Sequence, residues 1–544
     1  MRKKYYNVGM KIYVITISLL ILNTYAEVRS ETSNIKILFK NNEILPKYYV
    51  NNNYYHIKNC DKNKNKISIY DNNKNIKNYY INNTETKKIK LNNKYITIKC
   101  TPDYFNYFDY EFENNYNIKG YYFMDIGAIS IIYNTDGYPV WYRNYENYLP
   151  YYTSLDKKGV LTTVLYDRKI LKEHKVSVSN EKPTAYVLKY NIKHENIMNI
   201  ITPYEVINGE KKYPPIDYHG FHETKTGYYF ISYVDEIVPK ITMDKLYNYN
   251  DQTIEKTRIC NNFNKNILIR TPRIIKTDNT GLITWSNTIK IVDNYNEPTF
   301  FINSKLQDYP CIIDINHPNY VSTTIDESKI TVGLRNNYIV TYDKNKKIIH
   351  IISNYSKKRI ESLQNDIKEK ILEIKNDPLE GVCGTHGGYI NNKNEIILYD
   401  NRCNKNEASR AVIYEINEIK NTATMKKTFS LGEERCFTIK NGIISCNAES
   451  QGNAEFGSSG EIVINWGVIE GNNKTLTVYD NKYKKILEVN KNKNDITPNL
   501  YIIKYKNKRD TIDLEKNIKY ILSDEKNKKN NEKLEDLIKK LIDK

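Results

Sequence analysis

The chain has 544 residues, which can bury a large core and exceed one ordinary domain, unless one domain is an array of repeats. Its formal net charge is +18, but the lysines are dispersed in asparagine-rich loops such as DKNKNK and NKYKK and form no single basic stripe. This dispersion argues against nucleic-acid binding. The positive charge fits either a small anionic substrate or simply a solvated surface.

The first 26 residues have the pattern of a signal peptide. A basic start precedes an apolar run from Ile12 to Leu22, and small residues follow near Thr24 and Ala26. We expect cleavage after Ala26. An uncleaved anchor is the alternative, but this run is short for a spanning helix and no later stretch is apolar enough to cross a membrane. The sequence therefore predicts a secreted or extracellular chain without stable membrane insertion.

Eight cysteines, an even number, suit an oxidising compartment. The sequence leaves their connectivity open, but proximity suggests four pairs: Cys60 with Cys100, Cys260 with Cys311, Cys383 with Cys403, and Cys436 with Cys446. The segment between the last two reads as a hairpin with an Asn-Gly turn. No Cys-x-x-Cys pair occurs, so we expect neither a structural zinc site nor a catalytic thiol. Sequons stand at Asn82, Asn354 and Asn473 and would be glycosylated in a eukaryotic source.

Residues 27–100 contain short alternating runs, IKILF, YYHIKNC, KISIYD and KYITIKC, separated by asparagine-rich turns. Alternation with a period of two predicts strands that are buried on one face. We expect a small N-terminal β domain of the sandwich type here.

Residues 101–508 repeat a strand-and-turn pattern. TDGYPVW at residues 135–141 and DNTGLITW at residues 278–285 both place a turn glycine before a strand whose tryptophan would pack between neighbouring units. Self-similarity at about 40 to 50 residues is typical of a β-propeller with four strands per blade. The predicted fold class is therefore all-β.

Three segments depart from this pattern. Residues 235–243, DEIVPKITM, predict an apolar loop. Residues 356–377 have apolar side chains near helical spacing and predict a surface helix. The charged tail, residues 509–544, predicts an amphipathic helix that could dock on its own domain, pair with another chain or fray. Nothing in the sequence sets the oligomeric state.

Four motifs follow one another in the second half of the chain: GTHGGY around His386, ILYDN ending at Asp400 and Asn401, SRAVIYEI from Ser409 and Arg410, and NWG at residues 465–467. In this order the sequence resembles the arylsulfotransferase family, PAPS-independent secreted enzymes, over roughly residues 103–490. The resemblance implies a six-bladed β-propeller preceded by an N-terminal β domain. It also implies an aryl sulfate donor, a phenolic acceptor and no cofactor.

The resemblance assigns roles to five residues. His386 corresponds to the nucleophile that holds the sulfuryl group as a sulfohistidine. DYHGFHE resembles an Asp-x-His segment and favours His219, with the nearby His222 as a packing residue, and DINHPN matches Asp-x-x-His-x-Asn at His317 and Asn319. Either His219 or His317 would transfer the phenol proton. Arg335 would bind the sulfuryl oxygens with its planar fork, and Asn319 would assist.

Two residues within these motifs have a different expected role. Ser409 and Arg410 are predicted to be structural, with Arg410 bracing the blades and an anion contact as the alternative. Two rival hypotheses also stand. Three histidines from different blades could hold a metal ion in a hydrolase, or the propeller could bind glycans or proteins without catalysis.

Overall fold

The computed structural model describes the following residues: 35–39, 42–44, 54–60, 65–71, 74–82, 86–91, 94–102, 110–113, 118–135, 137, 139–169, 182–238, 267–289, 300–303, 311–314, 317–335, 338–353, 365–402, 407–431, 437–439, 443–445, 448, 451–467, 474–491, 503–507, 511, 514 and 524–542. Described strands dominate both compact units, Met1–Phe108 and Asp109–Lys544, which confirms the all-β class.

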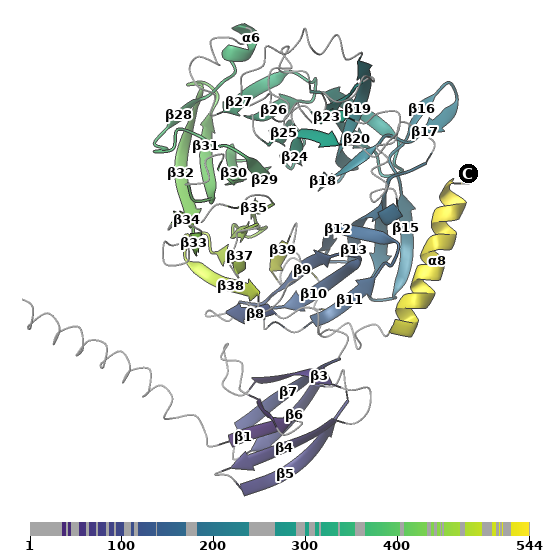
Figure 1. Cartoon of the computed structure of the whole chain (residues 1–544), viewed down its shortest axis with the longest axis vertical. Coiled ribbons are helices and arrows are strands. Elements are labelled where there is room, and N and C mark those ends of the chain that lie inside the picture. Colours follow the sequence, from purple (N-terminus) through teal and green to yellow (C-terminus); the bar gives the residue numbers. More distant parts are fainter. Residues whose placement is uncertain are drawn as a thin grey trace, which may run out of the picture. The chain divides into compact units, whose positions relative to one another are not determined.

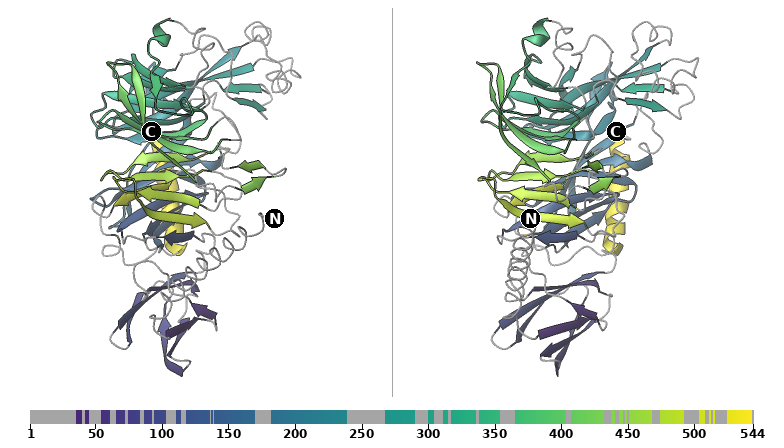
Figure 2. Two further views of the ribbon diagram at one scale, coloured as in Figure 1. Left: turned by 90° about the vertical axis from the view of Figure 1, so that its left-hand side faces the viewer. Right: turned by 60° about the vertical axis from the view of Figure 1, so that its left-hand side comes forward.

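The N-terminal unit consists of two sheets around one core (Figure 2, purple strands). One sheet has the order β2-β1-β4-β5 and the other β3-β7-β6. In β4 the buried Ile67 and Ile69 alternate with Lys66 and Ser68, so one face of the sheet is apolar. The bounds are β1 (Ile35–Phe39), β2 (Asn42–Ile44), β3 (Tyr54–Cys60), β4 (Asn65–Asp71), β5 (Lys74–Ile81), β6 (Thr86–Leu91) and β7 (Lys94–Pro102).

A disulfide joins Cys60 of β3 to Cys100 of β7, the pair that the sequence predicts. Cys383 is also disulfide-bonded, but its predicted partner Cys403 lies outside the described residues. The same holds for Cys260, Cys436 and Cys446 and for the side chain of Cys311. The hairpin expected between Cys436 and Cys446 is present as β33 (Phe437–Ile439) and β34 (Ile443–Ser445). Asn82 is exposed after β5, whereas Asn354 and Asn473 lie outside the described residues.

The second unit is built from mainly antiparallel sheets of consecutive strands, placed around a common centre (Figure 1). Each of five sheets contains four strands that follow one another in the chain. The first two sheets contain β12 (Tyr148–Leu155), β13 (Val160–Asp167), β14 (Ala185–Asn191) and β15 (Asn196–Ile201), and then β18 (Ile216–Glu223), β19 (Tyr228–Val238), β20 (Ile267–Thr277) and β21 (Ile283–Thr288). The next three contain β24 (Pro318–Thr323), β25 (Lys329–Leu334), β26 (Tyr338–Asp343) and β27 (Ile348–Ser353); β29 (Thr385–Ile390), β30 (Glu395–Asp400), β31 (Arg410–Asn417) and β32 (Thr422–Ser430); and β35 (Asn453–Phe456), β36 (Ile462–Asn465), β37 (Lys474–Tyr479) and β38 (Lys485–Lys491).

The remaining large sheet joins the two ends of the unit. β39 (Ile503–Asn507) pairs with β9 (Gly120–Ile126), next to β10 (Ile129–Asn134) and β11 (Pro139–Asn144). In return β8 (Tyr110–Glu113) pairs with β38 in the last sheet. The C-terminal strand β39 thus completes the first sheet of the unit, and the N-terminal strand β8 completes the last one. This exchange of strands links the first sheet to the last. Smaller additions are the hairpin β16 (Glu205–Ile207) and β17 (Glu210–Lys212), and the strands β22 (Phe300–Asn303), β23 (Cys311–Asp314) and β28 (Glu373–Lys375).

One turn type recurs between neighbouring strands. The side-chain oxygen of an Asp or Asn accepts hydrogen bonds from backbone N–H groups two and four residues later, at Asp156, Asp278, Asp343, Asn391 and Asp480. Asp and Asn favour such turns because their short side chains reach their own backbone. The DNTG motif seen in the sequence is one of these turns.

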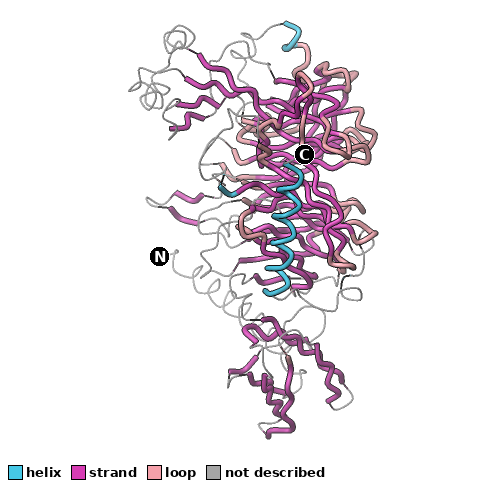
Figure 3. The backbone as a smooth tube through the Cα atoms, turned by 90° about the vertical axis from the view of Figure 1, so that its right-hand side faces the viewer, coloured by secondary structure: helices cyan, strands magenta, loops and turns pink. Residues whose placement is uncertain are grey.

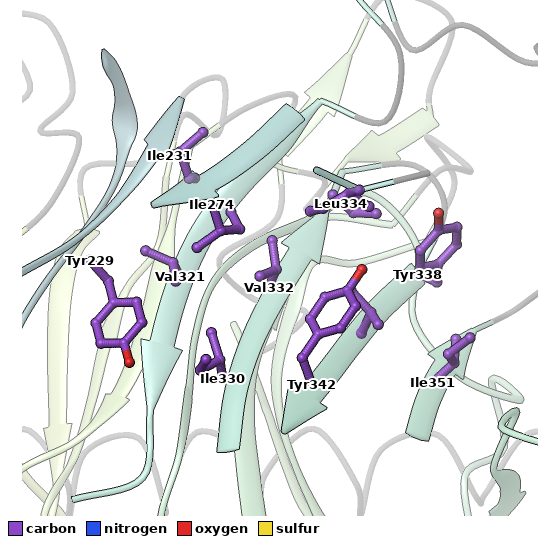
Figure 4. Packing of buried hydrophobic residues seen from close by; sticks show 12 residues of the cluster. Tyr229, Ile231, Ile274, Val321, Ile330, Val332, Leu334, Tyr338, Tyr342 and Ile351 are labelled. Carbon is purple, nitrogen blue, oxygen red and sulfur yellow. The ribbon is translucent and has the colours of Figure 1, made fainter. Parts of the chain in front are cut away.

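The core lies between adjacent sheets (Figure 4). Tyr229, Ile231 and Ile274 of one sheet pack against Val321, Val332 and other apolar residues of the next. Trp285 packs against this cluster and donates its Nε1–H to the Lys344 carbonyl at 3.0 Å. Trp141 is buried 6.2 Å from the ring of Tyr190 in the neighbouring sheet. Both tryptophans therefore pack between sheets, as the sequence predicts.

Two local predictions are wrong. Asp235–Val238 is not a loop, because it continues β19 and pairs with β20. The helix predicted over residues 356–377 is reduced, in its described part, to α6 (Asn365–Lys368), and Glu373–Lys375 forms β28 in parallel with β32. Leu372 is buried in the core beside this strand, so strand pairing and burial override the helical spacing.

The C-terminal tail forms helix α8 (Asp524–Ile542), which lies against the sheets of its own unit (Figure 3). Its Leu534 and Ile538 are buried, and Asn531 donates to the Asn144 carbonyl at 2.9 Å. The sequence left open whether this helix docks on its own domain, pairs with another chain or frays, and in the structure it docks on its own unit. Within the described part of the chain, no helix is both long and apolar enough to span a membrane.

Candidate functional site

The three predicted histidines come from three successive sheets. His219 lies in β18, His317 directly precedes β24, and His386 lies in β29. β18 contacts β24 and β24 contacts β29, and all three lie at the inner side of the ring (Figure 1). The rings of His219 and His317 are 4.6 Å apart and nearly perpendicular. The fold thus brings together residues separated by long stretches of sequence.

Each of these strands is irregular at its site residue. The pairing register shifts between Asp217 and Phe221, between Pro318 and Tyr320, and between His386 and Gly388. An extra residue in one strand redirects the side chain at that point, and such bulges are frequent beside functional sites. The regular alternation of inward and outward side chains is therefore interrupted at His219, directly after His386 and, in β24, at Asn319 rather than at His317.

His219 is fixed by Asp217. Its Nδ1 lies 2.5 Å from Asp217 Oδ1, its backbone N–H donates to the same oxygen at 2.7 Å, and Tyr233 donates to Oδ2 at 3.1 Å. Burial alone would raise the pKa of the Asp217 carboxyl, but His219 and then His317 lower this pKa to about 2. The carboxylate is therefore charged, and it favours a protonated His219. The Tyr218 ring stacks on His219 at 4.2 Å.

His386 is buried and neutral. Its Nδ1 lies 2.7 Å from Asn401 Oδ1. Burial lowers the pKa of its imidazole well below the usual value, and the positive charge of Arg335 and the nearby His219 and His317 lower this pKa further. A neutral imidazole retains one nitrogen lone pair, which a nucleophile requires.

Asn319 and Arg335 hold the strands around His386 and His317. Asn319 is buried, and its Nδ2 donates to the carbonyl of Thr385, the residue before His386, at 2.7 Å. The backbone N–H of Arg335 donates to the His317 carbonyl at 2.8 Å. One N–H of the Asn319 amide is thus engaged with the backbone, so its predicted substrate contact would use the rest of the amide. His222 lies farther along β18, with its ring 6.3 Å from Tyr389.

The two glycines after His386 are required by close packing. Gly387 has a φ of +47°, and a Cβ there would lie 1.9 Å from Asn453 Oδ1 and 2.7 Å from the Asn453 Cα. A Cβ on Gly388 would lie 2.7 Å from the Tyr320 ring. Neighbouring sheets therefore pack directly on the backbone beside His386, which supports this residue closely.

Arg410 and Arg402 form an ion-pair network with Asp400, which directly precedes Asn401, and Arg410 also pairs with Asp377. Arg410 donates to Asp400 at 3.0 Å and to both oxygens of Asp377 at 2.8 Å, and Arg402 also donates to Asp400. Ser409 Oγ donates to the Asn401 carbonyl at 2.7 Å. These bonds give Arg410 a structural role, as predicted, but they lie within one sheet and do not join neighbouring blades. Sequence reasoning missed Asp377 and Arg402, which no motif marks.

Three of the five predicted site residues line one small cavity, whereas His317 and Arg335 are not part of its lining. His219, Asn319 and His386 line it together with the aromatic side chains of Tyr152, Phe221 and Tyr389. Across the described ranges, no group of three or more His, Cys, Asp or Glu side chains is arranged to hold a metal ion. The chemistry that the site offers is a buried, neutral imidazole at His386 next to the imidazole of His219, which is hydrogen-bonded to the Asp217 carboxylate.

These features define an all-β protein with a histidine-centred site at the middle of a ring of sheets. The family model for Arylsulfotransferase (ASST) matches residues 253–511, so the chain carries a domain of the arylsulfotransferase family. The match includes His317, Asn319, Arg335 and His386, and His219 precedes it. This family match supports the interpretation that the chain is a sulfotransferase-type enzyme.

Among solved structures, the chain is similar to the periplasmic gluconolactonase PpgL of Pseudomonas aeruginosa, at 7% sequence identity and a TM-score of 0.34. That similarity covers 71% of this chain and 99% of the other. No curated protein sequence matches this chain.

Proposed function

We propose that this protein is a PAPS-independent sulfotransferase that moves a sulfuryl group from an aryl sulfate to a phenol through a sulfohistidine at His386. The observation that carries the proposal is the buried, neutral His386 beside Arg335, His219 and His317, within a chain that carries the family domain. We further propose that the ring of sheets is a six-bladed β-propeller, residues 101–508, and that residues 27–100 form a separate β-sandwich.

In the first half-reaction the imidazole lone pair of His386 forms a bond to sulfur. The bond between sulfur and the phenolic oxygen breaks, and its electron pair leaves on that oxygen, which takes a proton from a second histidine. In the second half-reaction an acceptor phenol returns a proton to that histidine, and its oxygen bonds to sulfur as the N–S bond breaks. The transfer is thus divided into two easier steps.

His219 is the better candidate for the proton transfer. Its Nδ1 is bonded to the charged Asp217, which stabilises the protonated ring, and its ring lies in contact distance of His317. A carboxylate partner lets a histidine alternate between acid and base near neutral pH. His317 would then orient the substrate or assist the transfer.

Arg335 supplies positive charge for the sulfuryl oxygens. Burial lowers the pKa of His386 most, and the charge of Arg335 lowers it further, so the two groups are close enough for their electrostatic interaction to matter. Charge on the equatorial oxygens grows during such transfers, and fixed donors and cations stabilise it. Burial and, after it, this charge keep His386 unprotonated and able to act as a nucleophile.

Residues 1–26 would direct export, and the disulfide between Cys60 and Cys100 fits an oxidising, extracellular location. Asn82 is exposed and available for glycosylation in a eukaryotic source. We expect the partners to be the aryl sulfate and the phenol, without nucleic acid or stable membrane insertion.

The test is to incubate the purified chain with 4-nitrophenyl sulfate, with and without phenol. Release of 4-nitrophenol that rises with phenol, and a sulfuryl mass on the peptide containing His386 without phenol, are expected. His386→Ala should abolish both, whereas His194→Ala, which changes a histidine on an exposed turn, should abolish neither. Full transfer by His386→Ala would refute the mechanism. Activity lost with a chelator and restored by zinc would favour the metal hydrolase.

A further inference from the structure

Asn401 determines which nitrogen of His386 carries the proton. Its Nδ2 donates to two backbone carbonyl oxygens, those of Ala448 and Gln451, both at 2.9 Å. Carbonyl oxygens only accept, so both amide protons of Asn401 are directed to them. The other end of the amide, Oδ1, faces His386 Nδ1 at 2.7 Å and can only accept. Nδ1 of His386 must therefore donate.

The tautomer of His386 follows from this orientation. The ring is neutral, because burial, Arg335, His219 and His317 all lower its pKa. A neutral imidazole carries one N–H, and here that N–H is at Nδ1. The lone pair is consequently at Nε2, on the opposite side of the ring.

The amide and the carboxylate in this site have different effects. Asp217 bonds to His219 Nδ1 with a full negative charge and favours a protonated ring. Asn401 makes the equivalent bond to His386 without a charge, so it orients the ring with a much smaller rise in its basicity. Two histidines with the same kind of contact are thereby suited to different tasks.

We propose that Asn401 is a positioning residue that holds His386 in its Nδ1–H form, so that Nε2 is the nitrogen that bonds to sulfur. This inference rests on the proposed function for the bond to sulfur, but the tautomer can be measured without any substrate. When Nε2 bonds to sulfur, the ring gains positive charge, and the proton on Nδ1 stays in its hydrogen bond to Asn401. Asn401 would then stabilise the sulfurylated ring in the same geometry.

Asn421 offers a matched control. Its Nδ2 also donates to two backbone carbonyl oxygens, those of Glu369 at 3.4 Å and Ile371 at 3.0 Å, from the exposed turn between β31 and β32 of the same sheet. Asn421→Ala removes the same kind of bonds as Asn401→Ala and leaves His386 untouched, although it also adds local backbone strain, because Asn421 has a φ of +51°. A difference between the two variants therefore reports the contact with the imidazole.

The experiment is nitrogen NMR of the full chain labelled with 15N-histidine, with the His386 signals assigned by their absence in His386→Ala. In the unchanged protein we expect a protonated Nδ1 and an unprotonated Nε2. Asn401→Ala should give exchange between both tautomers and about a 10- to 100-fold fall in sulfuryl transfer, whereas Asn421→Ala should change neither.

An unchanged protein with the proton on Nε2, or an unchanged tautomer in Asn401→Ala, would overturn the proposal. The first of these results uses only the His386→Ala assignment and so does not depend on how Asn401→Ala folds. If the tautomer behaves as expected but no sulfuryl transfer occurs, the positioning role stands and the proposed function fails.

Discussion

Arg410 and Asp377 form a buried ion pair in which Nη1 and Nη2 each donate to one carboxylate oxygen at 2.8 Å. Asp377 precedes the strand of His386, and Arg410 opens β31 beside Asp400 and Asn401. The pair therefore fastens the segment before the proposed nucleophile to the strands that carry its partner. It links the stability of this sheet to the geometry of the site.

Asp377→Ala should destabilise the protein by about 3 kcal/mol, because it leaves the buried guanidinium of Arg410 with one carboxylate fewer. Urea unfolding measures this change. The control is Glu373→Ala, which breaks the exposed ion pair with Lys375 and should leave the unfolding midpoint nearly unchanged. Equal effects of the two variants would contradict a structural role for the buried pair.

The contribution of Asp377 should depend on pH. Burial alone raises the pKa of its carboxyl, but the hydrogen bonds from Arg410 and Tyr414 bring this pKa to about 2. A lowered folded-state pKa gives stability that is present above the unfolded value of about 4 and is lost as pH falls towards 2. The difference in unfolding free energy between the unchanged protein and Asp377→Asn should therefore shrink between these values. A difference that grows on acidification would reverse the assigned sign.

Gly387→Ala should lower stability and activity by more than the backbone strain of a positive φ alone would cause. A Cβ at this position meets Asn453 Oδ1 at 1.9 Å, whereas one at Gly127, with a similar φ of +55°, meets nothing within 4 Å. Gly127→Ala should cost about 1 kcal/mol. Gly387→Ala should cost clearly more and lower sulfuryl transfer as well. Thermal unfolding and transfer assays compare the two, and matching results would show that the contact with Asn453 is unimportant.

The sequence predicted much of the local structure, since strands and turns depend on neighbouring residues. DNTG forms the expected turn at Asp278, and Trp141 and Trp285 pack between sheets as their motifs indicate. The failures depend on distant residues. Residues 373–375 have helical spacing in the sequence, yet they pair with β32, which follows some 50 residues later.

The site was predictable in its residue types but not in its hydrogen bonds. Motifs marked His386, His317 and His219, and they also contained Asn401 and Asp217. No pattern indicated that Asn401 would orient His386, because that contact depends on a register shift in β29 and on the carbonyls of Ala448 and Gln451. Such shifts break the period of two on which strand predictions rest.

Asp217→Asn should separate proton transfer from bond formation at sulfur. The amide keeps the shape of Asp217 but removes the charge that stabilises protonated His219. Transfer from phenyl sulfate, whose leaving phenol needs a proton, should fall about 100-fold, and transfer from 4-nitrophenyl sulfate should fall less. Asp156→Asn, a turn substitution far from the histidines in sequence, is the control. An equal loss with both donors would assign the proton to another group, with His317 as the next candidate.

Arg335→Ala should retain the nucleophile and lose stabilisation of the transferring group. The expected fall in the transfer rate is about 100-fold, or about 3 kcal/mol of transition-state stabilisation. Removing this charge should also raise the pKa of His386, because Arg335 now lowers it. Arg335→Lys keeps the charge without the planar fork, so it should restore the low pKa of His386 but only part of the rate. Nitrogen NMR titration and transfer assays measure the two quantities separately. If Arg335→Ala transfers sulfuryl groups at the original rate, the sulfate-binding role of Arg335 is wrong, whatever happens to His386.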